Sequence, residues 1–258
     1  MNGSLLTSKT GLQAQELQLQ YISNNIANAS TASYKASRPE FAALMAVKVR
    51  EASSSEGSAT GGLQVGTGVK AVGMVVDYSQ GQPIQTGREL DVMIQGDGFF
   101  KVVNEDGDEY YTRKGSFVID EDGMLSSLSN YTLDPQIEIP EDAETVTFEK
   151  DGTVIAKSVD NPEGDEVGQI ELYRFINNNG LKQMDDGLYQ MTESSGDEIA
   201  GDPNDSSFGY LLQGYTEGSN VDTVTEMVNM ITAQRGYEMA SKTMNASNEM
   251  MQSLNNIL

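Results

Sequence analysis

The sequence contains no cysteine, no histidine and no tryptophan among its 258 residues. Without cysteine the chain can form neither a disulfide nor a thiolate zinc site, and it has no cysteine nucleophile. Without histidine it lacks the commonest metal ligand and the commonest general base near neutral pH. These absences exclude most familiar catalytic centres, so we expect a protein that is not an enzyme and has no catalytic residue, metal or cofactor.

Long apolar runs are also missing. No stretch approaches the ~18 consecutive apolar residues of a membrane span. In the first 30 residues Lys9 is the only cation, and polar residues interrupt every apolar run, so the pattern of a cleaved signal peptide is absent. We therefore expect no membrane insertion, and a chain that is either cytoplasmic or exported without a cleaved signal.

Basic residues are few: 16 Lys and Arg against 39 Asp and Glu give a net charge of −23. A chain this acidic is repelled by phosphate backbones and by anionic membranes, which excludes nucleic acid as a partner. The acids are concentrated in residues 51–218, which hold 33 acidic and nine basic side chains. Residues 1–50 carry +3 and residues 219–258 carry −2, so the two ends can approach other protein.

Both ends show a seven-residue apolar period, which is typical of helices that pack in coiled coils. In the N-terminal segment this line consists of Leu5, Leu12, Leu19 and Ile26, with Ile22 beside it. The C-terminal line consists of Met230, Tyr237, Met244, Met251 and Leu258, and a second line three residues later consists of Ala233, Ala240, Ser247 and Leu254. The small side chains of the second line would allow another helix to approach closely.

The C-terminal helix is expected to start near residue 220 and to run to the end of the chain. Ser219, Asn220 and Thr223 are candidate N-caps, and Thr223 with Glu226 matches a capping box. Neither terminal helix has a partner nearby in the sequence, so the two must pair with each other or with other copies of the chain. The alternative is that both pack on the central domain. Termini usually fray unless they dock, so the long patterned ends favour assembly.

The middle of the chain changes period. Residues 51–62 are rich in Ser, Gly and Ala and read as a linker. From residue 65 short β-rich runs follow, separated by Asp-Gly turns at 106–107, 122–123, 151–152 and 186–187. We expect these strands at Val69–Val76, Asp91–Val103, Tyr110–Ile119, Tyr131–Leu133, Thr145–Phe148, Thr153–Lys157, Ile170–Ile176 and Leu188–Met191.

The predicted fold class is therefore α+β: terminal coiled-coil-forming helices flank a mainly antiparallel β domain. The predicted segments are an N-terminal assembly helix, an extended linker, a β outer domain and a C-terminal assembly helix, at residues 1–35, 36–64, 65–218 and 219–258.

Three motifs could indicate a site. The acidic loops at 104–108 and 120–123 lack the twelve-residue spacing of a calcium loop and are better explained as hairpin turns. The G-x-G pairs at 66–68 and 96–98 do not continue into a phosphate-binding pattern, so they too indicate turns. Asn24, Asn25 and Asn28 lie near the end of the first helix, where they either stop the helix or fix the register of its packing.

Several longer motifs resemble the flagellar axial proteins, which form the rod and hook. The resemblance runs in order along nearly the whole chain and is closest to the distal rod member of the basal-body rod family. It rests on SNNIANAS at 23–30 with SYK at 33–35, VGTGV at 65–69, DVMIQGDGFFKV at 91–102, YTRKGSFVIDEDGML at 111–125, and LLQGYTEGSNVDTVTEMVNMITAQRGYE at 211–238. Two positions depart from the family pattern: Asn130 follows Ser129 where a Gly-containing turn is usual, and Ala32-Ser33 stands where Asn or Gly often precedes the aromatic residue.

The resemblance implies a structural subunit of the flagellar rod, exported by the flagellar type III apparatus without a cleaved signal. Such a subunit polymerises helically into a hollow drive shaft in the periplasm, which transmits torque and passes exported subunits. Its partners would be further copies of itself, proximal rod and hook subunits, and the surrounding ring proteins. The expected assembly interface comprises Leu5, Leu12, Leu19, Ile22, Asn24, Asn25, Ile26, Asn28, Met230, Tyr237, Met244, Met251, Leu254 and Leu258.

Other identities stay open at this point. The resemblance also fits a proximal rod or hook subunit of the same family. A reading of another class is an acidic, secreted, calcium-dependent enzyme or adhesin built on the β domain. That reading gives no reason for two heptad helices at opposite ends of the chain.

Overall fold

In the part of the chain that it describes, the computed structural model contains two α-helices, two short 3-10 helices (Asn178–Gly180 and Asp185–Gly187) and 22 strands. That part is residues 2–50, 53–55, 58–60, 63–158, 161 and 164–255. The chain divides into two compact units, each built from segments that are distant in the sequence. The helical unit comprises residues 1–28, 37–77 and 222–258, and the β unit comprises residues 29–36 and 78–221.

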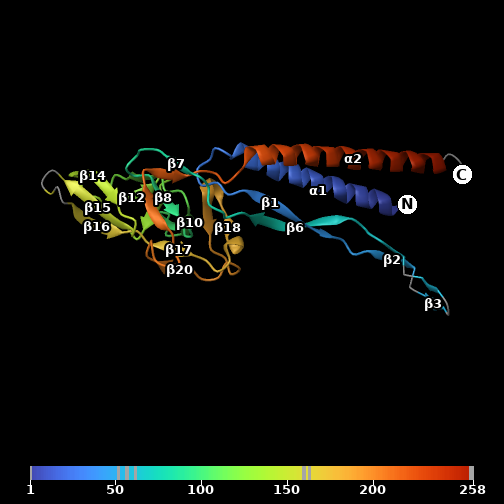
Figure 1. Cartoon of the computed structure of the whole chain (residues 1–258), viewed down its shortest axis with the longest axis horizontal. Coiled ribbons are helices and arrows are strands. Elements are labelled where there is room, and N and C mark those ends of the chain that lie inside the picture. The colour runs from blue at the N-terminus through green and yellow to red at the C-terminus, as the bar shows by residue number, and fades with distance from the viewer. Residues whose placement is uncertain are drawn as a thin grey trace. The chain divides into compact units, whose positions relative to one another are not determined.

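The helical unit contains both terminal helices. Helix α1 (Asn2–Ala27) and helix α2 (Thr223–Asn255) lie side by side in the same chain (Figure 1). Of the two alternatives left open by the sequence, pairing with each other is therefore the one that the fold contains. Within the described residues, no helix is both long and apolar enough to cross a bilayer.

Helix α2 is capped by a residue that the sequence did not single out. The Asp222 carboxylate accepts the backbone N–H of Val224 (3.0 Å) and the hydroxyl of Thr225 (2.6 Å). These hydrogen bonds hold the pKa of Asp222 below its usual value. The predicted caps Ser219, Asn220 and Thr223 were therefore wrong. The reason is that Asp222 immediately precedes the first helical turn, where a carboxylate also interacts favourably with the helix dipole.

The predicted linker is mostly strand. Strand β1 (Ser37–Ala43) pairs with β6 (Val69–Val76), β2 (Val47–Arg50) with β5 (Leu63–Val65), and β3 (Ser53–Ser55) with β4 (Ser58–Thr60), all antiparallel. The chain thus forms a two-stranded ribbon that folds back on itself. Val69–Val76, expected in the β domain, instead groups with the helices. The ribbon packs on α1, where the Thr10 hydroxyl lies 3.4 Å from the backbone nitrogen of Val69.

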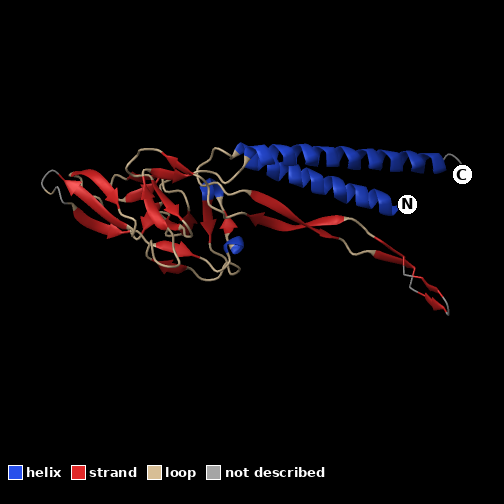
Figure 2. Ribbon diagram, viewed as in Figure 1, coloured by secondary structure: helices blue, strands red, loops and turns tan. Residues whose placement is uncertain are grey.

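The β unit is built from antiparallel strands (Figure 2). Its largest sheet has seven strands in the order β11-β12-β13-β9-β10-β19-β18, and β14, β15 and β16 form a second sheet. Three further pairs are β17 with β20, β21 with β8 and β22 with β7. The bounds are β7 (Pro83–Gln85), β8 (Val92–Gln95), β9 (Phe100–Val103), β10 (Glu109–Thr112), β11 (Phe117–Ile119), β12 (Leu125–Ser127), β13 (Thr132–Asp134), β14 (Ala143–Phe148), β15 (Thr153–Ser158), β16 (Asp165–Gln169), β17 (Leu172–Arg174), β18 (Lys182–Gln183), β19 (Leu188–Gln190), β20 (Ile199–Gly201), β21 (Tyr210–Gln213) and β22 (Tyr215–Glu217).

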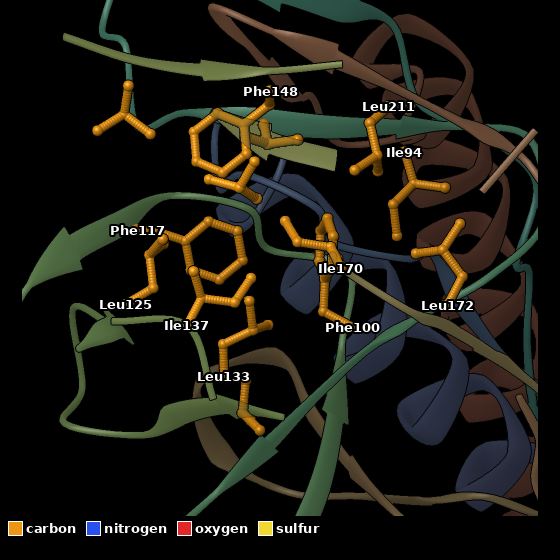
Figure 3. Packing of buried hydrophobic residues seen from close by; sticks show 14 of the residues in the cluster. Ile94, Phe100, Phe117, Leu125, Leu133, Ile137, Phe148, Ile170, Leu172 and Leu211 are labelled. Atoms are coloured by element: carbon orange, nitrogen blue, oxygen red, sulfur yellow. The ribbon is translucent and has the colours of Figure 1, made fainter. Parts of the chain in front are cut away.

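One apolar core holds these strands together. Phe100 and Phe117 meet edge to face at its centre, with ring centroids 5.3 Å apart, and aliphatic side chains from several strands surround them (Figure 3). Burying each such side chain stabilises the fold by roughly 1.5–3 kcal/mol. Gly115 lies against this core. A side chain at this position would collide with the carbonyl oxygen of Val92. A second cluster contains Phe99, Tyr111, Tyr173, Phe175, Leu181 and Tyr189.

The coarse fold prediction is confirmed: two terminal helices flank a mainly antiparallel β domain. The predicted strand Asp91–Val103 was wrong as a single element, because it breaks into β8 and β9. Gly96 and Gly98 adopt φ values of 116° and 142° between these two strands, a region that residues with a side chain rarely enter. The predicted strand Tyr110–Ile119 likewise divides into β10 and β11.

Candidate assembly interface

The face of α2 that packs on α1 is narrow and lined by small residues. Ala233 is 1% exposed and Ser247 is 6% exposed, and both belong to the predicted line of small side chains. Gly236 sits on the same face, where a methyl group would lie only 3.0 Å from Gln15 Oε1 of α1. Small side chains thus let the two helices approach each other closely, because little side-chain volume separates their backbones.

The predicted large residues flank this narrow seam. On α2, Met230, Met244 and Met251 are partly buried and Tyr237 is 42% exposed. On α1, Ile22 is 5% exposed, and the partly buried residues are Leu5, Leu12, Leu19 and Ile26. Packing within the helical unit therefore leaves part of the predicted apolar lines uncovered. Leu258 lies outside the described residues, as does the side chain of Leu254.

The three predicted asparagines bond in two different ways. Asn25 is 3% exposed. Its side-chain amide bonds to both backbone groups of Ser37, as a neighbouring strand would: the nitrogen donates to the carbonyl (2.9 Å) and the oxygen accepts from the N–H (3.1 Å). Asn25 thereby joins the end of α1 to the start of β1. Asn28 instead donates to the backbone carbonyl of Asn24 (2.9 Å), one turn back in the helix. Asn25 thus bonds to the start of β1 and Asn28 bonds back within the last turn of α1, while a role of these asparagines in the register of helix packing stays a prediction.

A second apolar stripe on α2 was missed by the sequence analysis. Val224, Val228 and Ile231 follow one another at helical spacing and are 68%, 58% and 52% exposed. Met227 extends the same side and is 55% exposed. Met239 and Met250 are also exposed (64% and 61%) but lie further round the helix, toward Ser247. At 100° per residue this outer stripe lies opposite Ala233 and Ser247. The i, i+4, i+7 spacing of its first three members was the signal that could have revealed it.

A metal site is the other kind of site that acidic side chains could form. Among the residues that the structure describes, no group of three or more Asp or Glu side chains is arranged to hold a metal ion. What the helical unit presents is a packed helix pair whose second helix is apolar on two opposite sides. Exposed apolar faces of this kind commonly mark contacts with another surface.

Comparison with known families agrees with this geometry. The family described as "Flagella basal body rod protein" matches residues 5–35. "Flagellar hook protein FlgE/F/G D1 domain" matches residues 93–156, and "Flagellar basal body rod FlgEFG protein C-terminal" matches residues 212–257. Individual relatives cover nearly the whole chain. A flagellar basal-body rod protein FlgG of Buchnera aphidicola is 42% identical over 257 residues, which are 98% of this chain and 99% of that protein.

The chain belongs to the flagellar basal-body rod protein family. FlgG of Caulobacter vibrioides is 40% identical over 96% of this chain and 97% of that protein. FlgF of Escherichia coli is 31% identical over 92% of this chain and 90% of that protein. Identity to these two FlgG proteins is thus higher than identity to this FlgF. Family membership confirms the resemblance seen in the sequence and the prediction of a structural protein rather than an enzyme.

Proposed function

We propose that this chain is the distal rod subunit of the bacterial flagellum and polymerises helically through its terminal helices. The role as a structural rod subunit follows from family membership along the whole chain. Its place is accordingly the flagellar basal body. The polymer would be a hollow drive shaft that transmits torque and passes exported subunits, with export by the type III apparatus.

The observation that carries the assembly mechanism is the outer apolar stripe of α2. One side of α2 packs on α1, and Val224, Val228 and Ile231 on the other side stay more than half exposed. Burying each such side chain contributes roughly 1.5–3 kcal/mol, and the stripe recurs in every subunit of a polymer. We assign its cover to the helices of further copies of the same chain. The predicted lines through Leu12, Leu19, Met230, Tyr237 and Met244 would complete the interface on either side.

The partners at the two ends of the polymer are proposed from the family alone. Proximal rod subunits would precede this chain in the shaft and hook subunits would follow it, because all three share the terminal helices. The ring proteins around the shaft would face the acidic β unit rather than the helices.

A charge placed in the outer stripe tests the mechanism. Val228→Asp should leave the folded monomer unchanged, because the side chain is more than half exposed. It should abolish polymerisation, because each contact would bury an unpaired carboxylate. The control is Asn229→Asp, which adds the same charge at the next, exposed position. Sedimentation and electron microscopy of both variants would decide: equal polymerisation of Val228→Asp and wild type would contradict the assigned interface.

A further inference from the structure

Three charged side chains are buried together in the β unit. Lys35, Arg113 and Glu217 are 1%, 4% and 1% exposed. Lys35 Nζ lies 2.6 Å from Glu217 Oε1, and Arg113 Nε lies 2.9 Å from Glu217 Oε2. The backbone N–H of Gly81 also donates to Oε1 (2.9 Å). One carboxylate is thus shared by two cations and a backbone amide.

Both cations of this cluster also donate to backbone carbonyls. Lys35 Nζ donates to the carbonyl of Ser79 (2.8 Å), and Arg113 Nη2 donates to the carbonyl of Gly96 (2.7 Å). Burial alone would raise the pKa of Glu217, but the charges of Arg113 and Lys35 outweigh it and hold the pKa below its usual value. Buried charges are tolerated only where they are paired and hydrogen-bonded in this way.

The cluster joins segments that lie close to the points where the chain enters or leaves the β unit. The chain passes between the two units after Asn28, Ala36, Asp77 and Val221. Lys35 stands next to the second of these crossings, and Ser79 and Gly81 follow the third. Glu217 precedes the fourth.

Asn220 ties the same segments a second time. Its side-chain oxygen accepts the backbone N–H of Ala36 (2.8 Å), and its side-chain nitrogen donates to the carbonyl of Ser79 (3.2 Å). Asn220 thus links residues that are more than 140 positions apart in the sequence, and it shares the Ser79 carbonyl with Lys35. Segments that connect structural units are ordinarily among the most mobile parts of a chain.

We propose that Lys35, Arg113 and Glu217 form a clasp that fixes the exits of the chain from the β unit. Buried ionic groups add little net stability over apolar packing, but they define position, because each charge has few acceptable partners. In the shaft, the fixed exits would transmit force between the β unit and the assembly helices, because the connecting segments could not move freely. This last step rests on the proposed function, whereas the clasp itself does not.

The clasp is tested by hydrogen exchange on the full-length chain. Lys35→Met removes one cation and leaves the Arg113–Glu217 pair balanced, so the β unit should stay folded. Amide exchange in residues 29–36, 78–81 and 215–221 should rise at least tenfold, while strands β8 and β9 keep their protection. The matched control is Lys101→Met, because Lys101 is a second buried lysine of this unit (6% exposed) that pairs with Glu109 and Glu198 away from the exits.

A second variant guards against general destabilisation. Asn220→Ala removes the side-chain bonds to Ala36 and Ser79 and leaves all three buried charges in place, and it should raise exchange in the same three segments. If both variants keep wild-type protection there, the clasp does not exist. If the exits loosen but cells with either variant swim normally in viscous medium, the load-bearing role is wrong. If the wild-type chain does not polymerise, the proposed function fails, while increased exchange would still support the clasp.

Discussion

Four described residues other than glycine adopt a left-handed backbone conformation, and two of them are Ser33 and Asn130. Ser33 has a φ of 58° and Asn130 has a φ of 59°. These are the two positions where the sequence departs from the family pattern. The chain turns at both positions although neither residue is glycine. Ser33 is held by its surroundings, because its N–H donates to the Glu217 carbonyl (2.8 Å) and its hydroxyl donates to the Arg113 carbonyl (2.9 Å).

At Asn130 the left-handed conformation predicts a specific order of stability. Asn130→Val should lower the free energy of unfolding by about 1–2 kcal/mol, because a branched side chain is strained at positive φ. Asn130→Gly should change it by less than about 1 kcal/mol, since relief of strain and greater freedom of the unfolded chain oppose each other. Urea unfolding of the three proteins measures both effects. Equal stability of the Val and Asn proteins would show that this residue is not left-handed in solution.

Glu217 makes stability dependent on pH. Its pKa is lowered in the folded protein, so the stabilisation is present above the unfolded value, about 4.3, and is lost as pH falls through the folded value. The melting temperature of the β unit should therefore fall on acidification below about pH 4.3. Glu217→Gln should be less stable at neutral pH and should lose less stability on acidification. Parallel pH profiles for variant and wild type would contradict the assigned role of this carboxylate.

At the scale of elements, the sequence predicted those helices and turns that a regular spacing of residues marks. The seven-residue lines through Leu12 and Met230 identified both helices, and four Asp-Gly pairs marked turns between strands. It left open whether α1 packs on α2 or on other copies of the chain, because about 190 residues separate the two helices. The join between Asn25 and Ser37 and the cluster around Glu217 were also hidden, since each depends on contacts that only the folded chain creates.

The narrow seam between α1 and α2 predicts that size, not polarity, limits substitution at Ala233. Ala233→Leu should lower the melting temperature of the helices, because overpacking a close contact typically costs about 1–3 kcal/mol. Ala246→Leu adds the same atoms at an exposed position of the same helix and should be nearly neutral. Circular dichroism at 222 nm during heating follows both variants. A Leu that is tolerated equally at the two positions would mean that the seam is loose.

At the scale of the whole molecule, charge separates the two units. Residues 29–36 and 78–221 carry 30 acidic and nine basic side chains, a net charge of −21. The helical unit carries nine acidic and seven basic side chains, a net charge of −2. Attraction between copies is therefore expected from the nearly neutral helices, while the β units repel one another.

This separation predicts that salt strengthens assembly. The Debye length falls from about 30 Å at 0.01 M to about 8 Å at 0.15 M ionic strength, so repulsion between neighbouring β units should weaken. Apolar contacts between helices do not depend on such screening. The amount of sedimentable polymer should rise between these two salt concentrations. A steady decrease would show that ion pairs between subunits outweigh the net repulsion.

The most direct test of the account is a helical reconstruction of polymers grown from the purified chain. We expect a tube whose inner layer consists of α1 and α2, with Val224, Val228 and Ile231 buried against helices of neighbouring subunits and the acidic β units outside. Polymers in which this stripe of α2 faces solvent, or in which the β units form the inner wall, would contradict it.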